Sequence, residues 1–183
     1  MANDSDSSLM AISPLDGRYK SKCADLAPYF SEFALMRYRV LVEVKWLQKL
    51  SEHDQIDDLQ VISDRGLQYL DDLIENFSLI DARRIKEIEA TTNHDVKAVE
   101  YFIKEKFEDN AELNDQLEFV HFAFTSEDIN NLAYALMLRD GRDKVVLDQM
   151  REIESTLAQL AKKFASQPLL CRTHGQPASP STV

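Results

Sequence analysis

Three of the four histidines stand in short polar segments whose side chains suit proton transfer or anion binding. The segments are residues 91–95, 121–128 and 172–177, and they contain His94, His121 and His174. Imidazole exchanges a proton near neutral pH, which suits general acid–base catalysis. The hydroxyls and free backbone N–H groups at helix starts bind carboxylates and phosphates. These residue types fit proton transfer on an anionic substrate, although their spacing alone names no reaction.

The first two segments also have an interpretation in which they only cap helices and have no catalytic role. Thr92 with Asp95, and Thr125 with Asp128, have the spacing of a capping box, in which a hydroxyl and a carboxylate three residues later close the first turn of a helix. The histidine of the first segment would then be a surface residue of a helical turn. That of the second would be a hydrogen-bonded core residue.

Two loop segments add further candidates. His174 lies beside Gly175 and Pro177, and loops carry functional residues disproportionately. Arg18 lies in a turn-forming stretch, residues 13–19. Its guanidinium is able to bind a phosphate as a charge-assisted fork, and the alternative is an arginine that stands in solvent.

The composition favours helices as the elements that hold these segments. The 183 residues include only four glycines and five prolines, too few turn formers for a sandwich, barrel or propeller. Hydrophobic residues make up 44% of the chain and charged residues 29%, as in folded domains. We therefore expect an all-α protein with long helices and few connections.

Apolar residues at steps of three and four place these helices along the chain. The predicted elements are helices over 31–53 and 63–77, one opening at Ser78 with Asp81 three residues later, one beginning near Asn93, a long bent helix or two nearly collinear ones over 126–165, and a closing loop to Val183. We expect a disordered tail over residues 1–8, an N-terminal helical domain over 9–111 that contains the candidate phosphate-binding turn at Arg18, and the beginning of a helical bundle over 112–183.

The last predicted helix carries an apolar seam that needs helical partners. The seam residues follow one another at steps of 4-3-4-3-4, as in bundle helices: Val146, Met150, Ile153, Leu157, Leu160 and Phe164.

Charge and cysteine content exclude several classes of partner. The net charge of −11 argues against a protein that binds a nucleic-acid backbone. No run approaches the about 18 apolar residues of a membrane span, and residues 1–8 lack a signal-peptide core. Cys23 and Cys171 lie far apart in the sequence and do not have the spacing of a metal site. We therefore expect two unpaired thiols in a reducing compartment. We expect a cytoplasmic protein that binds no metal, no cofactor and no membrane.

Four segments together give the sequence a family resemblance. Residues 13–19, 91–101, 121–131 and 172–182 match, in the same order along the chain, the motifs of the adenylosuccinate lyase family within the fumarase/aspartase superfamily. The resemblance is to the bacterial-type branch. It implies a lyase of purine nucleotide biosynthesis, which releases fumarate by β-elimination from adenylosuccinate to give AMP and from the succinyl-carboxamide ribotide.

The resemblance also implies roles for individual residues. The expected general acid is His174, with His94 in support. The expected binding residues are Arg18 and Tyr19 for the phosphate, Asn93, His94 and Asp95 for the nucleotide and succinyl groups, and Thr125 and Ser126 for a succinyl carboxylate. His121 and Gln176 are further candidates from the third and fourth segments.

One family motif has no counterpart in this sequence. The base of the family is a serine in a downstream loop, Ser-Ser-x-Met-Pro-x-Lys-x-Asn-Pro, which does not occur here. We therefore expect an N-terminal fragment, inactive alone, of an enzyme that forms homotetramers. The alternatives are another superfamily lyase (argininosuccinate lyase, fumarase or aspartase) and a non-catalytic helical oligomerisation module, which the apolar seam would favour.

Overall fold

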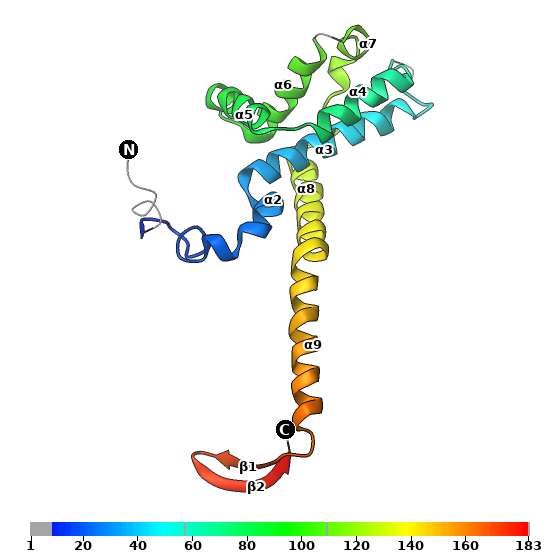
Figure 1. The fold of residues 1–183 in the computed structure, drawn as a ribbon. Coiled ribbons are helices and arrows are strands. Elements are labelled where there is room, and N and C mark those ends of the chain that lie inside the picture. Colours follow the sequence, from blue (N-terminus) through cyan, green and yellow to red (C-terminus); the bar gives the residue numbers. More distant parts are fainter. Residues whose placement is uncertain (1–8, 57, 109, 183) are drawn as a thin grey trace. The chain divides into compact units, whose positions relative to one another are not determined.

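The computed structural model describes residues 9–56, 58–108 and 110–182, and it confirms the all-α prediction apart from one hairpin (Figure 1). The predicted disordered tail, residues 1–8, lies outside the described residues. Two compact units divide between Gly141 and Arg142. The predicted domain boundary after residue 111 lies within a short helix, α7 (Ala111–Asn114), and remains a prediction. None of the described helices is long and apolar enough to cross a membrane.

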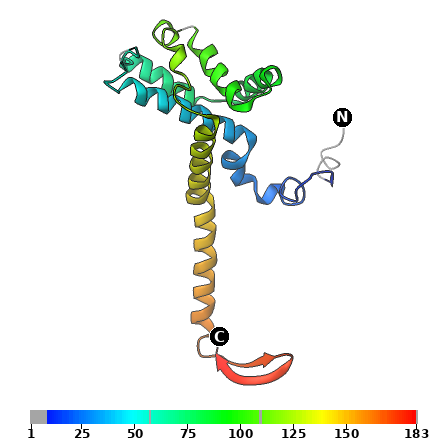
Figure 2. The same ribbon diagram turned by 180° about the vertical axis from the view of Figure 1, so that it is seen from behind.

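Helix α3 (Glu32–Ser51) is the element on which the first unit is built (Figures 1 and 2). It begins where predicted, because the Ser31 hydroxyl accepts a hydrogen bond from the Ala34 backbone N–H at 3.2 Å. Five helices pack on it: α2 (Ala27–Phe30), α4 (Asp64–Glu75), α5 (Leu79–Thr92), α6 (Asp95–Phe107) and α8 (Ser126–Gly141). Short 3-10 turns complete the unit: η1 (Lys20–Lys22), η2 (Ala24–Leu26) and η3 (Leu117–Phe119).

The apolar residues that predicted these helices form the core of the first unit. Leu47, Leu70, Ile85 and Phe102 are almost completely buried in one cluster. A smaller cluster joins α3, α6 and α8 through Val42, Val96 and Ile129.

Local capping explains where α4 and α5 begin. The Ser63 hydroxyl accepts from the Gly66 N–H, and Ser78 with Asp81 forms the predicted capping box.

The predicted long helical stretch after residue 126 is confirmed. Helix α8 is followed directly by a π-helical segment, η4 (Arg142–Val146), and then by α9 (Leu147–Phe164). Gly141 ends α8 where the backbone comes close to an aromatic ring, because a Cβ there would lie 2.5 Å from Cε2 of Phe30. Only glycine fits at that distance without a shift.

The predicted closing loop is wrong, because these residues form a hairpin. Strands β1 (Pro168–Thr173) and β2 (Gln176–Thr182) pair antiparallel. His174 and Gly175 join them with φ values of 51° and 76°, and two positive φ values are typical of the type I′ turn that favours hairpins. The prolines of β2 are tolerated because a two-stranded ribbon has only edge strands.

Helix α5 offers a matched test of the core. Ile85 is 1% exposed and Ile80, on the same helix, is 74% exposed. We expect Ile85→Ala to lower the free energy of unfolding by about 2–5 kcal/mol, since it leaves a cavity. Ile80→Ala should change it by less than about 0.5 kcal/mol. Chemical denaturation followed by circular dichroism measures both values, and equal losses would contradict the described packing.

Candidate active site

The second matching segment forms the junction between α5 and α6. Asn93 ends α5 in the left-handed conformation, with φ 52°. The chain then turns, and His94 becomes the N-cap of α6: its Nδ1 accepts a hydrogen bond from the Lys97 N–H at 3.2 Å. The predicted capping box of Thr92 with Asp95 is therefore wrong. Thr92 is still part of α5, and its hydroxyl donates to the His94 carbonyl.

Asp95 fastens the start of α6 to α3. Its Oδ2 lies 2.6 Å from a guanidinium nitrogen of Arg39, which is 5% exposed. The Nε of Arg39 donates to Oδ1 of Asn130 at 3.0 Å, so one side chain of α3 binds both α6 and α8. Burial would raise the pKa of the Asp95 carboxyl, but the hydrogen bond and charge of Arg39 outweigh it and hold that pKa below its ordinary value.

Side chains of α3 also anchor the third matching segment. Nδ1 of His121 lies 2.6 Å from Oε1 of the buried Glu43. The Trp46 indole donates to the Phe122 carbonyl at 2.8 Å and stacks on Phe124 with ring centroids 4.3 Å apart. His121 is therefore hydrogen-bonded and mostly buried, as the interpretation without a catalytic role predicts, although 18% of its side chain is exposed to solvent.

The start of α8 shows the carboxylate half of the second predicted capping box. Asp128 accepts hydrogen bonds from both the N–H and the hydroxyl of Thr125, each at 2.8 Å. These bonds hold the pKa of Asp128 below its ordinary value. Ser126 is the first residue of the helix. An incoming anion would have to compete with Asp128 for the Thr125 donors.

The structure brings these two segments together on one side of α3. Val42, Val96 and Ile129 contact one another in a buried cluster, so the first turns of α6 and α8 are neighbours. His94, Asp95, His121, Thr125 and Ser126 all belong to the segments around this contact.

Arg18 and Tyr19 lie in another part of the first unit. The turn is closed by the Tyr19 N–H, which donates to the Pro14 carbonyl at 2.8 Å. The Arg18 guanidinium lies 5.5 Å from the centre of the Tyr19 ring. Arg18 also lines a mainly apolar cavity of about 620 Å³ with Leu9, Ala11, Ile12, Ser13, Pro14 and Gly17.

His174 and Gln176 belong to the second unit. His174 is the first turn residue of the hairpin, and Gln176 pairs with Thr173 across it. Both are exposed. The turn thus exposes His174 to solvent on a backbone with positive φ, which is uncommon for residues other than glycine.

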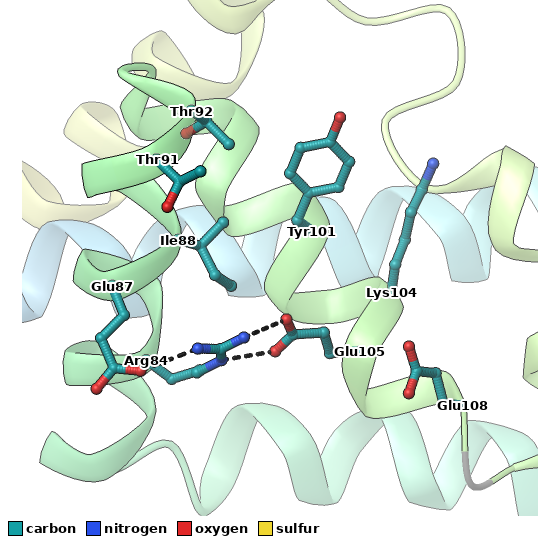
Figure 3. A pocket seen from close by; sticks show the side chains of 9 residues that line it. All are labelled: Arg84, Glu87, Ile88, Thr91, Thr92, Tyr101, Lys104, Glu105 and Glu108. Atoms are coloured by element: carbon teal, nitrogen blue, oxygen red, sulfur yellow. Dashed lines mark hydrogen bonds and ion pairs between the residues drawn. The ribbon is translucent and has the colours of Figure 1, made fainter.

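A further cavity, of about 370 Å³, lies between α5 and α6 (Figure 3). Figure 3 shows Arg84 between Glu87 and Glu105, and its guanidinium bonds to both. The other cation of the cavity, Lys104, pairs with Glu100. Because both cations are paired and the predicted site residues lie elsewhere, this cavity is not our candidate site.

The sequence reasoning missed the α3 side chains that hold the segments in place. Arg39, Glu43 and Trp46 follow Met36 at steps of three, four and three, the spacing that marked the apolar face of this helix. Charges at that spacing on a largely apolar helix indicate buried ion pairs, and this was the available signal.

The capping role of His94 is testable by stability measurements, apart from any role in catalysis. We expect His94→Ala to lower the free energy of unfolding by about 1 kcal/mol, since α6 loses its cap. His94→Asn should retain the stability, because the Asn oxygen accepts the same N–H. Thermal unfolding of this chain measures both, and a loss in His94→Asn equal to that in His94→Ala would contradict the capping role.

Comparison with known proteins gives the family. The Lyase family matches residues 17–183 of the chain. The chain is 55% identical to the adenylosuccinate lyase of Haemophilus influenzae and 53% identical to that of Escherichia coli (strain K12), over 97% of its own length and 39% of theirs. With that of Legionella pneumophila (strain Corby) it is 50% identical, over 96% of this chain and 38% of that protein. The chain thus spans about two fifths of the length of these relatives, and the predicted family resemblance is confirmed. The chain belongs to the Lyase family.

Proposed function

We propose that this chain is the N-terminal part of an adenylosuccinate lyase, which releases fumarate from adenylosuccinate to give AMP and acts likewise on the succinyl-carboxamide ribotide. The observation that carries the proposal is identity of 50% to 55% with adenylosuccinate lyases over nearly the whole chain. So long a match to adenylosuccinate lyases favours this reaction over those of the other superfamily lyases.

The proposed reaction needs a base at the succinyl Cβ and an acid at the departing amine. His174 is the proposed acid, since imidazole holds and releases a proton near neutral pH. The base is expected from the downstream serine loop. No metal or cofactor has a step in this scheme.

The remaining residues are proposed to bind the substrate. Arg18 and Tyr19 hold the phosphate, and Asn93 and Asp95 line the nucleotide and succinyl site with His94. Because Nδ1 of neutral His94 accepts from Lys97, its proton is on Nε2, which is then able to donate to a substrate oxygen. Thr125 and Ser126 are proposed to hold a succinyl carboxylate, with His121 and Gln176 as further contacts.

We also propose a homotetramer in the cytoplasm. The seam of α9 supports association, since Met150, Ile153 and Leu157 are each about 60% exposed on one stripe.

The deciding experiment is an assay of the complete gene product that contains this chain. Release of fumarate from adenylosuccinate supports the proposal. Turnover of argininosuccinate, malate or aspartate instead would assign the chain to another branch, and an open reading frame that stops at Val183 would favour the oligomerisation module.

In that gene product, His174→Ala should lower kcat by about 10²–10⁴-fold, as expected when a positioned acid is removed. The matched control is His53→Ala, which removes an exposed imidazole just beyond α3. Steady-state kinetics gives both values, and a loss below tenfold in a folded His174 variant would contradict the assignment.

Arg18→Ala should mainly raise KM for the nucleotide. A phosphate remote from the broken bond is held alike in ground and transition states, so kcat should change little. Lys20→Ala removes a nearby exposed cation and serves as the control. Unchanged kinetic parameters in Arg18→Ala would show that this arginine does not bind the substrate.

Made alone, the 183-residue chain should self-associate and release no fumarate. Burying each seam side chain is worth about 1.5–3 kcal/mol, which favours association. Light scattering should show oligomers that Leu157→Glu dissociates and Gln159→Glu, off the seam, does not. A monodisperse wild-type monomer would refute the association, and measurable turnover would refute the need for the serine loop.

A further inference from the structure

Glu43 is a buried acid in the middle of α3. Its side chain has no exposed surface, its Oε1 lies 2.6 Å from Nδ1 of His121, and its buried Oε2 has no hydrogen-bond partner among the described residues. A carboxylate in such a place is unfavourable unless a charged group compensates it. The ion-pair partner that the described residues give it is His121.

The other acids near His121 have partners of their own. From α6, Glu100 pairs with Lys97 at 2.8 Å and with Lys104 at 3.1 Å. From α8, Asp128 accepts two hydrogen bonds from Thr125. Glu43 is thus the acid whose compensation depends on the imidazole.

The pair therefore holds a proton more tightly than its separate groups would. Burial raises the pKa of Glu43, and the hydrogen bond that His121 donates to Glu43 raises the pKa of His121. Both directions describe one proton that the pair keeps to higher pH.

The loop that contains His121 needs support from α3. His121 and Ala123 have φ values of 65° and 58°, which non-glycine residues rarely adopt and which surrounding contacts must maintain. Glu43 supplies one contact, and Trp46 supplies the others through Phe122 and Phe124. The loop leads directly into Thr125 and the start of α8.

We propose that Glu43 is a positioning residue that accepts a hydrogen bond from Nδ1 of the charged His121 imidazolium and so leaves its second N–H, on Nε2, to bind an anion at the start of α8. An ionised carboxylate only accepts hydrogen bonds, so the proton of Nδ1 points at Glu43. The identification of the anion as a carboxylate of the substrate rests on the proposed function. The geometry of the Glu43–His121 pair is independent of that function.

Nuclear magnetic resonance of the whole chain, labelled with ¹⁵N-histidine, tests the pair without any activity. Long-range proton–nitrogen correlations report which ring nitrogen carries the proton. We expect Nδ1 of His121 to be protonated across its titration. In Glu43→Gln the midpoint of that titration should fall by about one pH unit or more.

Glu52→Gln is the matched control, because it removes an exposed acid that pairs with Lys49 just beyond the end of α3. Glu52→Gln should leave the titration midpoint of His121 unchanged. Glu43→Gln should leave the resonances of the other three histidines unchanged. An unprotonated Nδ1 in the wild-type chain would overturn the proposal even if Glu43→Gln does not fold. A His121 midpoint that Glu43→Gln leaves in place would also overturn it.

Kinetics of the complete gene product tests the anion. If the charge on His121 binds it, kcat/KM falls as pH rises through the His121 pKa, and Glu43→Gln moves that fall to lower pH by the shift seen in resonance. A uniform loss at every pH would reduce Glu43 to a structural role and refute this part. If resonance gives the expected result but the gene product lacks lyase activity, the proposed function fails and the positioning of His121 stands.

Discussion

The buried guanidinium of Arg39 is the interaction on which the arrangement of the first unit depends. A buried charge without partners is too unfavourable to persist, so the chain must bring it acceptors. Asp95 and Asn130 supply them from helices far along the sequence, 56 and 91 residues away. Since apolar replacements of such pairs are often equally stable, its effect lies in selecting one placement of α6 and α8 on α3.

Glu43, one helical turn after Arg39, is a buried negative charge that also needs a partner. It finds His121 at a separation of 78 residues. The two buried charges of α3 thus bind different segments: Arg39 binds the starts of α6 and α8, and Glu43 binds the loop before α8. The small cluster of Val42, Val96 and Ile129 fills the space between these elements. An apolar helix at this place would attract the same neighbours with less control over their register.

How far the sequence predicts this structure depends on how local each cause is. The starts of α3, α4 and α5 follow from Ser31, Ser63 and Ser78, whose partners lie three residues away, and the apolar steps locate the core. The cap on α6 was misassigned because the left-handed Asn93 moves the helix start by a few residues. The hairpin was missed because the two prolines of β2 suggest a loop, whereas the decisive feature is the backbone conformation of His174. The residues that support the candidate site were missed for the opposite reason, since their partners lie 56 and 78 residues away.

These constraints bear on how an anion could be bound at the start of α8. Free N–H groups at a helix start attract anions, but here Asp128 already occupies the Thr125 donors and contributes its own negative charge. An incoming carboxylate would meet repulsion as well as competition. A positive charge beside the helix start removes that obstacle, and His121 is suited to supply it because Glu43 favours its protonated form. The acid buried in α3 and the anion proposed at the surface are in this way linked through one imidazole ring, with a nitrogen for each.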